Sequence, residues 1–460
     1  MANLESTTAA PSVAEVVARL ERLPPSRWHV RMRSIIGVAW FFDAFDALAI
    51  AYVLPVLIGM WKLSPLEIGS LIAVGYVGQA IGSLFFGWLA ERWGRVPCAL
   101  ITLAIFTVFS FLCAFAWSLQ SLMWLRFLQG IGLGGEIPIL HAYVNEFANS
   151  KRRGRFTVIT QLPFPLGLFA AALIGTWTVP HWGWQSMFII GALPALLALP
   201  LRLLLPESPR WLVNNGKARE AGKVLDGIEA SITAEGKTLP PLTTGASVMP
   251  TTARFGDLLR GIYLRRSLVI WAMWFCCYLV VYGLAGWLPS IYRTVYKLSV
   301  QEALQYGLIS SIAGLLGCVI AAWLIDIIGR RLLIAACMVL GGLPMLALYW
   351  ASALSAWEVL VLVCISFALT NAVALCLGIY TAENYPTSLR AFGSGVGSMW
   401  VRIASILGPY LVGFTLPLAG VGTVFVLFGA VSIIGGLICL MFAIETRGRV
   451  LEELSPPLTP

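Results

Sequence analysis

Long apolar runs, separated by short polar stretches, recur along the whole chain. Windows of about 20 apolar residues, the length that crosses a bilayer as a helix, predict twelve spans: 35–59, 66–90, 97–117, 121–147, 156–179, 184–205, 267–290, 302–325, 332–353, 356–380, 392–415 and 420–443. A long polar stretch, 206–266, lies between the sixth and seventh spans. We therefore expect an all-α membrane protein with two six-helix bundles, 34–205 and 267–443, flanked by polar segments 1–33 and 444–460.

Composition and charge support this fold class and exclude others. Hydrophobic residues make up 59% of the 460 residues and charged residues 12%, which is too apolar for a soluble protein of this length. The net charge of +9 comes mainly from Lys and Arg in alternate loops, as the positive-inside rule describes, so nucleic-acid binding is not expected. The basic segment 206–266 predicts that this segment and both termini are cytoplasmic.

The sequence contains no pattern that indicates an enzyme or a cofactor. The nine cysteines lie in or beside apolar segments without metal-ligand spacing, so neither a metal site nor a disulfide framework is expected. We find no nucleotide-binding loop and no nucleophile elbow. ATP-driven transport is therefore disfavoured.

Two loop motifs occur once in each half of the chain. Glu91 and Gly94 recur as Asp326 and Gly329 (326 − 91 and 329 − 94 both give 235), and the Glu146 motif recurs 237 residues later (383 − 146). Nearly equal offsets indicate parallel repeats, as in major facilitator transporters. We expect the motif charges to form a cytoplasmic gate, with simple topological anchoring as the alternative: Glu91, Arg95, Glu146, Arg153, Asp326, Arg330, Glu383 and Arg390.

These motifs make the whole chain resemble the major facilitator superfamily. The segments 206–212 and 445–449 resemble those of sugar-porter-like branches, and the segments 42–46, 134–138 and 383–390 resemble those of the metabolite:proton symporter branch. Within that branch the chain is most similar to bacterial nicotinate permeases. The branch also includes aromatic-acid symporters and is related to organic-ion transporters and synaptic vesicle protein 2. The resemblance implies a proton-coupled carrier of the bacterial inner membrane.

Buried charges in the predicted spans are candidates for proton coupling. Asp43 and Asp46, three residues apart, share one face of span one, and a charge at the centre of a span costs about 3 kcal/mol. Arg126 in span four needs a partner, and we expect an acid of span one. The resemblance gives Asp46 and Arg126 the places of the family's proton-coupling pair, which leaves Asp43 as a second site or a substrate contact. Glu136 is either another proton site or a structural acid.

The substrate candidates lie in the second half. Arg402 lies mid-span with no acid nearby in span eleven, and a guanidinium binds a carboxylate through two hydrogen bonds. An aromatic stripe at a spacing of four residues, Trp274, Tyr278 and Tyr282, would stack a flat ring, although such stripes also serve packing. Further lining candidates are Gln161, Asn371, Tyr380 and Trp400.

These expectations combine into one transport hypothesis. The chain imports a small aromatic or heteroaromatic monocarboxylate, nicotinate first, together with protons, and works as a monomer in the lipid bilayer. Residues 1–205 would rock against 267–443 about a central site. A benzoate-type symporter, an organic-cation carrier and a non-transporting receptor or scaffold stay open as alternatives.

Overall fold

The computed structural model describes residues 11–148, 156, 159–160, 162–202, 204–242 and 255–447. Every regular element in these ranges is a helix. The α-helices are α1 (Val13–Glu21), α2 (Arg27–Trp61), α3 (Pro65–Trp93), α4 (Arg95–Cys113), α5 (Leu119–Phe147), α7 (Pro163–Trp182), α8 (Gln185–Arg202), α9 (Pro209–Asn214), α10 (Ala218–Ala234), α11 (Gly261–Ala285), α12 (Leu288–Thr294), α13 (Val300–Ile328), α14 (Arg330–Ala347), α15 (Ala356–Asn384) and α16 (Thr387–Phe442). Two 3₁₀ helices, η2 (Phe255–Leu259) and η3 (Leu348–Ala353), precede α11 and α15.

The predicted all-α fold with twelve spans is confirmed. In the described ranges, nine helices are long and apolar enough to cross a membrane. The helices α5 and α8 add two spans, and α16 counts twice because its backbone breaks at Gly420, where φ is 76°. α5 carries Arg126 and Glu136 among its buried residues, which lowers its hydropathy without changing its position within the bundle.

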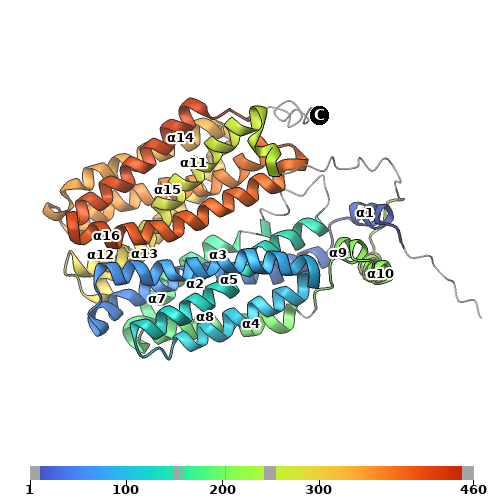
Figure 1. The fold of residues 1–460 in the computed structure, drawn as a ribbon, viewed down its shortest axis with the longest axis horizontal. Helices are drawn as coiled ribbons and strands as arrows, with labels where there is room; N and C mark the ends of the chain where they lie inside the picture. The colour runs from blue at the N-terminus through green and yellow to red at the C-terminus, as the bar shows by residue number, and fades with distance from the viewer. Residues whose placement is uncertain are drawn as a thin grey trace, which may run out of the picture.

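The helices form two bundles that lie side by side (Figure 1). One contains α2 to α8, in which α3 packs on α5 and α2 packs on α7. The other contains α11 to α16, in which α11 and α14 pack on α16 and α13 packs on α15. Contacts of α3 with α16 and of α7 with α13 join the two bundles.

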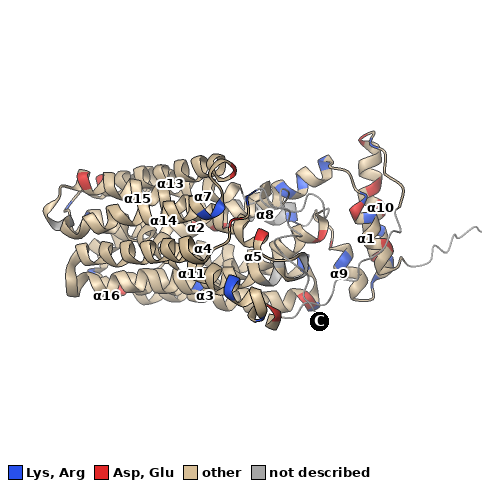
Figure 2. Ribbon diagram, turned by 90° about the horizontal axis from the view of Figure 1, so that it is seen from above, with Lys and Arg blue, Asp and Glu red and all other residues tan. Residues whose placement is uncertain are grey.

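The two ends of the bundles differ in charge. We call the end at which α2 begins and α16 ends the terminal end, and the opposite end the distal end. Lys, Arg, Asp and Glu gather towards the terminal end, whereas the long helices are nearly free of charge (Figure 2). This distribution is what a bilayer around the helices requires, because charged groups are expensive in its core.

The helix boundaries repeat between the halves for a local chemical reason. At the distal end, α3 and α13 both begin with a capping box, formed by Ser64 with Glu67 and by Ser299 with Glu302, which satisfies the first free backbone N–H groups. Their terminal ends stop at Gly94 and Gly329, whose φ values are 105° and 100°. Residues with a Cβ rarely adopt this conformation, which explains the glycine in both loop motifs.

A small helical unit covers the terminal end of the first bundle. Helices α1, α9 and α10 lie there in Figure 1, and apolar side chains of these helices form one core with α2 and α5. Arg19 of α1 donates hydrogen bonds to Asp226 and Glu229 of α10 at 2.6 and 2.7 Å. The segment before α2 is therefore held by the segment that follows α8.

Candidate functional site

The glycines of α5 let this helix approach α3 closely. A Cβ at Gly130 or Gly134 would collide with backbone oxygens of Gly75 or Gln79. On the α3 side, a Cβ at Gly82 would collide with the backbone of Ile131. This close packing brings the polar side chains of α5 next to α2 and α3.

Arg126 pairs with Asp46, which is the contact with span one that the sequence predicts. The guanidinium donates to an oxygen of Asp46 at 3.0 Å, and both side chains are buried. Gln129, one turn after Arg126, completes the group: it accepts from Arg126 at 2.9 Å and donates to the other Asp46 oxygen at 2.7 Å. Each oxygen of this carboxylate therefore has a hydrogen-bond donor.

A second buried ion pair lies nearer the terminal end. Arg202 of α8 donates to one oxygen of Glu136 at 2.5 Å, with side chains only 2% and 1% exposed. Sequence reasoning missed Arg202 because it ends an apolar run. The pair gives Glu136 the partner that a structural acid needs, and the same acid remains a candidate for carrying a proton.

Asp43 lies among these groups but makes no hydrogen bond with the described part of the chain. Both of its carboxylate oxygens are buried and lack a partner among the described residues. Its charged neighbours are Glu136, Arg202, Arg402 and Asp46. The two acids of α2 thus share a face, as expected, but have different surroundings.

Arg402 reaches across the interface between the bundles. Its guanidinium donates to the side-chain oxygen of Gln79 on α3, and it interacts electrostatically with Tyr76, Tyr282 and Asp43. Arg402 is partly exposed although it lies in the middle of a long apolar helix. Arg402 is therefore a partly exposed cation between the bundles, and its hydrogen bond goes to a neutral amide.

The predicted aromatic stripe lies beside Arg402. Trp274 stacks on Tyr278 and Tyr278 on Tyr282, with ring centroids 5.2 and 5.8 Å apart. The stripe continues across the interface, because Tyr282 meets Tyr76 edge to face at 5.3 Å. The absence of a side chain at Gly397 on α16 leaves room for the Trp274 ring. Three flat rings and a guanidinium thus occupy adjacent faces of α11 and α16.

The other lining candidates are dispersed. Asn371 donates to the Phe367 carbonyl within α15 at 2.8 Å. Trp400 packs edge to face on Phe275 at 5.8 Å. Tyr380 lies at the terminal end, where its hydroxyl donates to the Ile444 carbonyl at 3.0 Å. The next residue, Thr381, accepts a hydrogen bond from the Trp274 indole N–H at 2.9 Å. Gln161 lies outside the described residues.

The motif charges at the terminal end form two matching clusters. In the first bundle, Arg95 pairs with Glu91 and Glu146, both at 2.9 Å. Glu207 accepts from the Arg95 backbone N–H at 3.1 Å. This arrangement ties α3, α4, α5 and the segment after α8 together.

The second bundle repeats the arrangement. Arg330 pairs with Asp326 at 2.8 Å and Glu383 at 3.0 Å, and Glu445 accepts from the Arg330 backbone N–H at 2.9 Å. Burial opposes ionisation of Glu445, but hydrogen bonds from backbone N–H groups outweigh it and lower its pKa.

These clusters do not join the bundles in this conformation. No ion pair among the described residues crosses from one bundle to the other. The bundles instead meet nearer the distal end, for example where the Thr176 hydroxyl donates to the Leu304 carbonyl at 3.2 Å. Of the other gate candidates, Arg153 lies outside the described residues, as does the side chain of Arg390.

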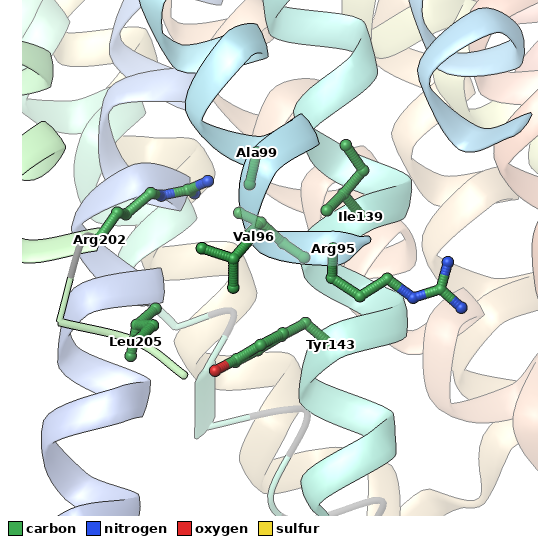
Figure 3. Close-up of a pocket in the computed structure, with 8 residues that line it drawn as sticks. Arg95, Val96, Ala99, Ile139, Tyr143, Arg202 and Leu205 are labelled. Atoms are coloured by element: carbon green, nitrogen blue, oxygen red, sulfur yellow. The ribbon is translucent and has the colours of Figure 1, made fainter. Parts of the chain in front are cut away.

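A cavity near the terminal end of the first bundle is too small for an aromatic acid. Its volume is about 10 Å³, which holds about one water molecule. Figure 3 shows the Val96, Leu205 and Tyr143 side chains around it; the guanidinium group of Arg95 extends away from them, whereas that of Arg202 points towards Val96 and Ala99. Arg402 and the aromatic stripe do not line this cavity.

Several known proteins are similar to this chain in sequence or in fold over almost the whole chain. The niacin transporter NiaP of Acinetobacter baylyi is 32% identical over 441 residues, covering 96% of this chain and 99% of that protein. A gallate transporter of Pseudomonas putida is 31% identical and covers 91% of both chains. The crystal structure of a D-xylose-proton symporter matches the fold with a TM-score of 0.68 at 19% identity, over 91% of this chain and 99% of that one.

The family model for "Sugar (and other) transporter" matches residues 33–457. Its members and the relatives above are membrane transporters and not enzymes. The chain has the fold of a major facilitator superfamily proton:xylose symporter, as the resemblance in its motifs predicts. It therefore belongs to the sugar (and other) transporter family.

Proposed function

We propose that this transporter imports a small aromatic or heteroaromatic monocarboxylate, nicotinate first, together with a proton. The observation that carries the proposal is the position of Arg402: it is accessible in mid-helix, its hydrogen-bond acceptor is the neutral Gln79 amide, and the Tyr278 and Tyr282 rings lie close by. A substrate carboxylate is a stronger acceptor for a guanidinium than an amide oxygen. The rings provide apolar surface for a flat substrate.

The relatives support this substrate class. Two of them are a niacin transporter and a gallate transporter, and both of these compounds have a planar ring with a carboxylate. Because one relative is a gallate transporter, a benzoate-type acid is the second candidate substrate. An organic cation fits less well, because Arg402 would repel it.

The proton is proposed to bind the acids of α2, where Asp43 and Asp46 lie beside Arg126 and Glu136. Alternating access would come from movement of the two bundles about the Arg402 region, with the motif clusters closing the terminal end in the other state. The basic loops place the terminal end in the cytoplasm. In this orientation, contacts between the bundles near the distal end, such as Thr176 with Leu304, would close the outer side of a monomeric carrier in a bacterial inner membrane.

A competition panel tests the substrate assignment. Uptake of labelled nicotinate into proteoliposomes is measured with excess unlabelled nicotinate, nicotinamide, benzoate or a quaternary amine. We expect inhibition by nicotinate, weaker inhibition by benzoate and little by nicotinamide or the amine. Inhibition by the amine alone, or equal inhibition by nicotinamide and nicotinate, would exclude carboxylate recognition.

A further inference from the structure

The site contains as many acids as arginines, but not every acid is hydrogen-bonded to an arginine. Three acids, Asp43, Asp46 and Glu136, face three arginines, at positions 126, 202 and 402. Two acids have an arginine as hydrogen-bond donor. Asp43 has no donor among the described residues, and Arg402 has only a neutral acceptor in its one hydrogen bond there.

The surroundings of Asp43 leave Arg402 as its counter-charge. Asp46 lies on the same helix, Glu136 faces Asp43 from α5, Arg202 faces it from α8 and Arg402 faces it from α16. Arg202 is hydrogen-bonded to Glu136 and Asp46 is hydrogen-bonded to Arg126. Arg202 keeps two unpaired N–H groups, Nε and Nη1, but its charge is already balanced by Glu136. Among the described residues near Asp43, Arg402 is therefore the arginine that no carboxylate pairs with.

We propose that Asp43 and the substrate carboxylate compete for the positive charge of Arg402, which makes Asp43 the group that binds the coupled proton. This inference rests on the proposed function and refines it, because the family position alone favours Asp46. A carboxylate bound at Arg402 beside an ionised Asp43 would leave one buried negative charge uncompensated, which is strongly unfavourable. A proton on Asp43 converts that carboxylate to a neutral acid and removes the excess charge.

The stoichiometry follows from this competition. Each monocarboxylate that binds Arg402 brings one proton to Asp43, so the loaded carrier has the same net charge as the empty carrier. When the substrate leaves, Arg402 again favours ionised Asp43 and the proton is released to the same side. While no substrate is bound, the side-chain oxygen of Gln79 accepts a hydrogen bond from the Arg402 guanidinium.

Nicotinate binding to the purified protein, measured by calorimetry across a range of pH, tests the assignment. In the wild type, affinity should fall about tenfold per pH unit on the alkaline side, since one proton is bound with each anion. Asp43→Asn should abolish this pH dependence and keep the affinity of the acid side. Asp46→Asn serves as the matched control and should keep the slope. Retention of the slope in Asp43→Asn, or its loss in Asp46→Asn alone, would overturn the assignment.

Proton uptake by the wild type provides a test that does not depend on any variant. Nicotinate added to the protein in weakly buffered solution with a pH indicator should be accompanied by uptake of about one proton per bound nicotinate, from the linkage between the two binding events. Binding without proton uptake would overturn the inference and leave the proposed substrate intact. Absence of nicotinate binding would instead overturn the proposed function.

Discussion

Arg402 of α16 donates a hydrogen bond to the side-chain oxygen of Gln79 on α3, and this contact joins the two bundles. The residues come from different halves of the chain and lie 323 positions apart. Arg402 is accessible and Gln79 is buried. The pair links the proposed substrate site to the relative position of the bundles, because a carboxylate that replaces Gln79 also removes a bond between them.

Replacement of Arg402 should change the choice of substrate. Loss of hydrogen bonds to a charged group removes about 1.5–3 kcal/mol, so Arg402→Ala should weaken nicotinate binding by about tenfold to a hundredfold. Nicotinamide, which has no carboxylate, should bind equally to both proteins. Arg402→Lys keeps the charge but not the paired donors, and it should restore affinity only in part. Equal loss for both ligands in calorimetry would mean that Arg402 supports the fold and not the carboxylate.

The Asp46–Arg126 pair should show strong coupling in stability. Removing one member of a buried ion pair costs about 3–5 kcal/mol, because the other charge stays buried. Asp46→Asn and Arg126→Gln should each lower the thermal unfolding midpoint in detergent, and the double variant should be more stable than the sum of both effects predicts. Additive losses would show that the two side chains do not depend on each other.

Close packing of α3 on α5 should make one glycine of α3 irreplaceable. A Cβ at Gly82 would meet the backbone of Ile131, whereas at Gly87, on the same helix, nothing lies within 4 Å. Overpacking costs about 1–3 kcal/mol, so Gly82→Ala should lower the unfolding midpoint. Gly87→Ala is the control and should not lower it. Similar midpoints for the two variants would contradict the close approach.

Docking of α1 on α10 should depend on pH through Glu229. Burial opposes ionisation of this acid, but hydrogen bonds from Arg19 and Arg22 outweigh it and lower its pKa. Such an acid stabilises the folded contact above its unfolded pKa of about 4.3. That stabilisation is lost as pH falls through the lower folded pKa. Backbone amides of residues 13–21 should therefore be protected from hydrogen exchange at neutral pH, and this protection should be lost only in strong acid.

Variants separate this contact from general acid unfolding. Glu229→Gln should reduce the protection of residues 13–21 from hydrogen exchange even at neutral pH. Glu220→Gln, at an exposed position of the same helix, should leave it unchanged. Unchanged exchange in Glu229→Gln would show that apolar contacts alone hold α1.

Patterns along the chain were sufficient to predict the spans, the repeat and a contact of Arg126 with an acid of span one, and the family resemblance singled out Asp46. Span length depends on hydrophobicity, and an arginine inside a span requires a nearby acid. Hydrogen-bond partners that depend on helix rotation were not predictable in this way. Gln79 looked like an ordinary polar residue of span two, and Arg202 like the end of span six. Gln129 had a signal that could have been used, because it lies one turn from Arg126.

Tyr380 is a predicted lining residue, and the structure places it near the end of α15, beside Ile444. Its position near the end of α15 reflects the length of that helix, which continues to Asn384. Apolar windows do not define such extensions, because helices continue beyond the bilayer core.

Gradient-driven uptake tests the central claim most directly. Labelled nicotinate is offered to proteoliposomes that contain the purified protein, with the outside made more acidic than the inside. The account predicts accumulation above the external concentration, which collapses when a protonophore removes the gradient and is absent from protein-free vesicles. Equilibration without accumulation, or the same accumulation with and without the gradient, would contradict proton-coupled import.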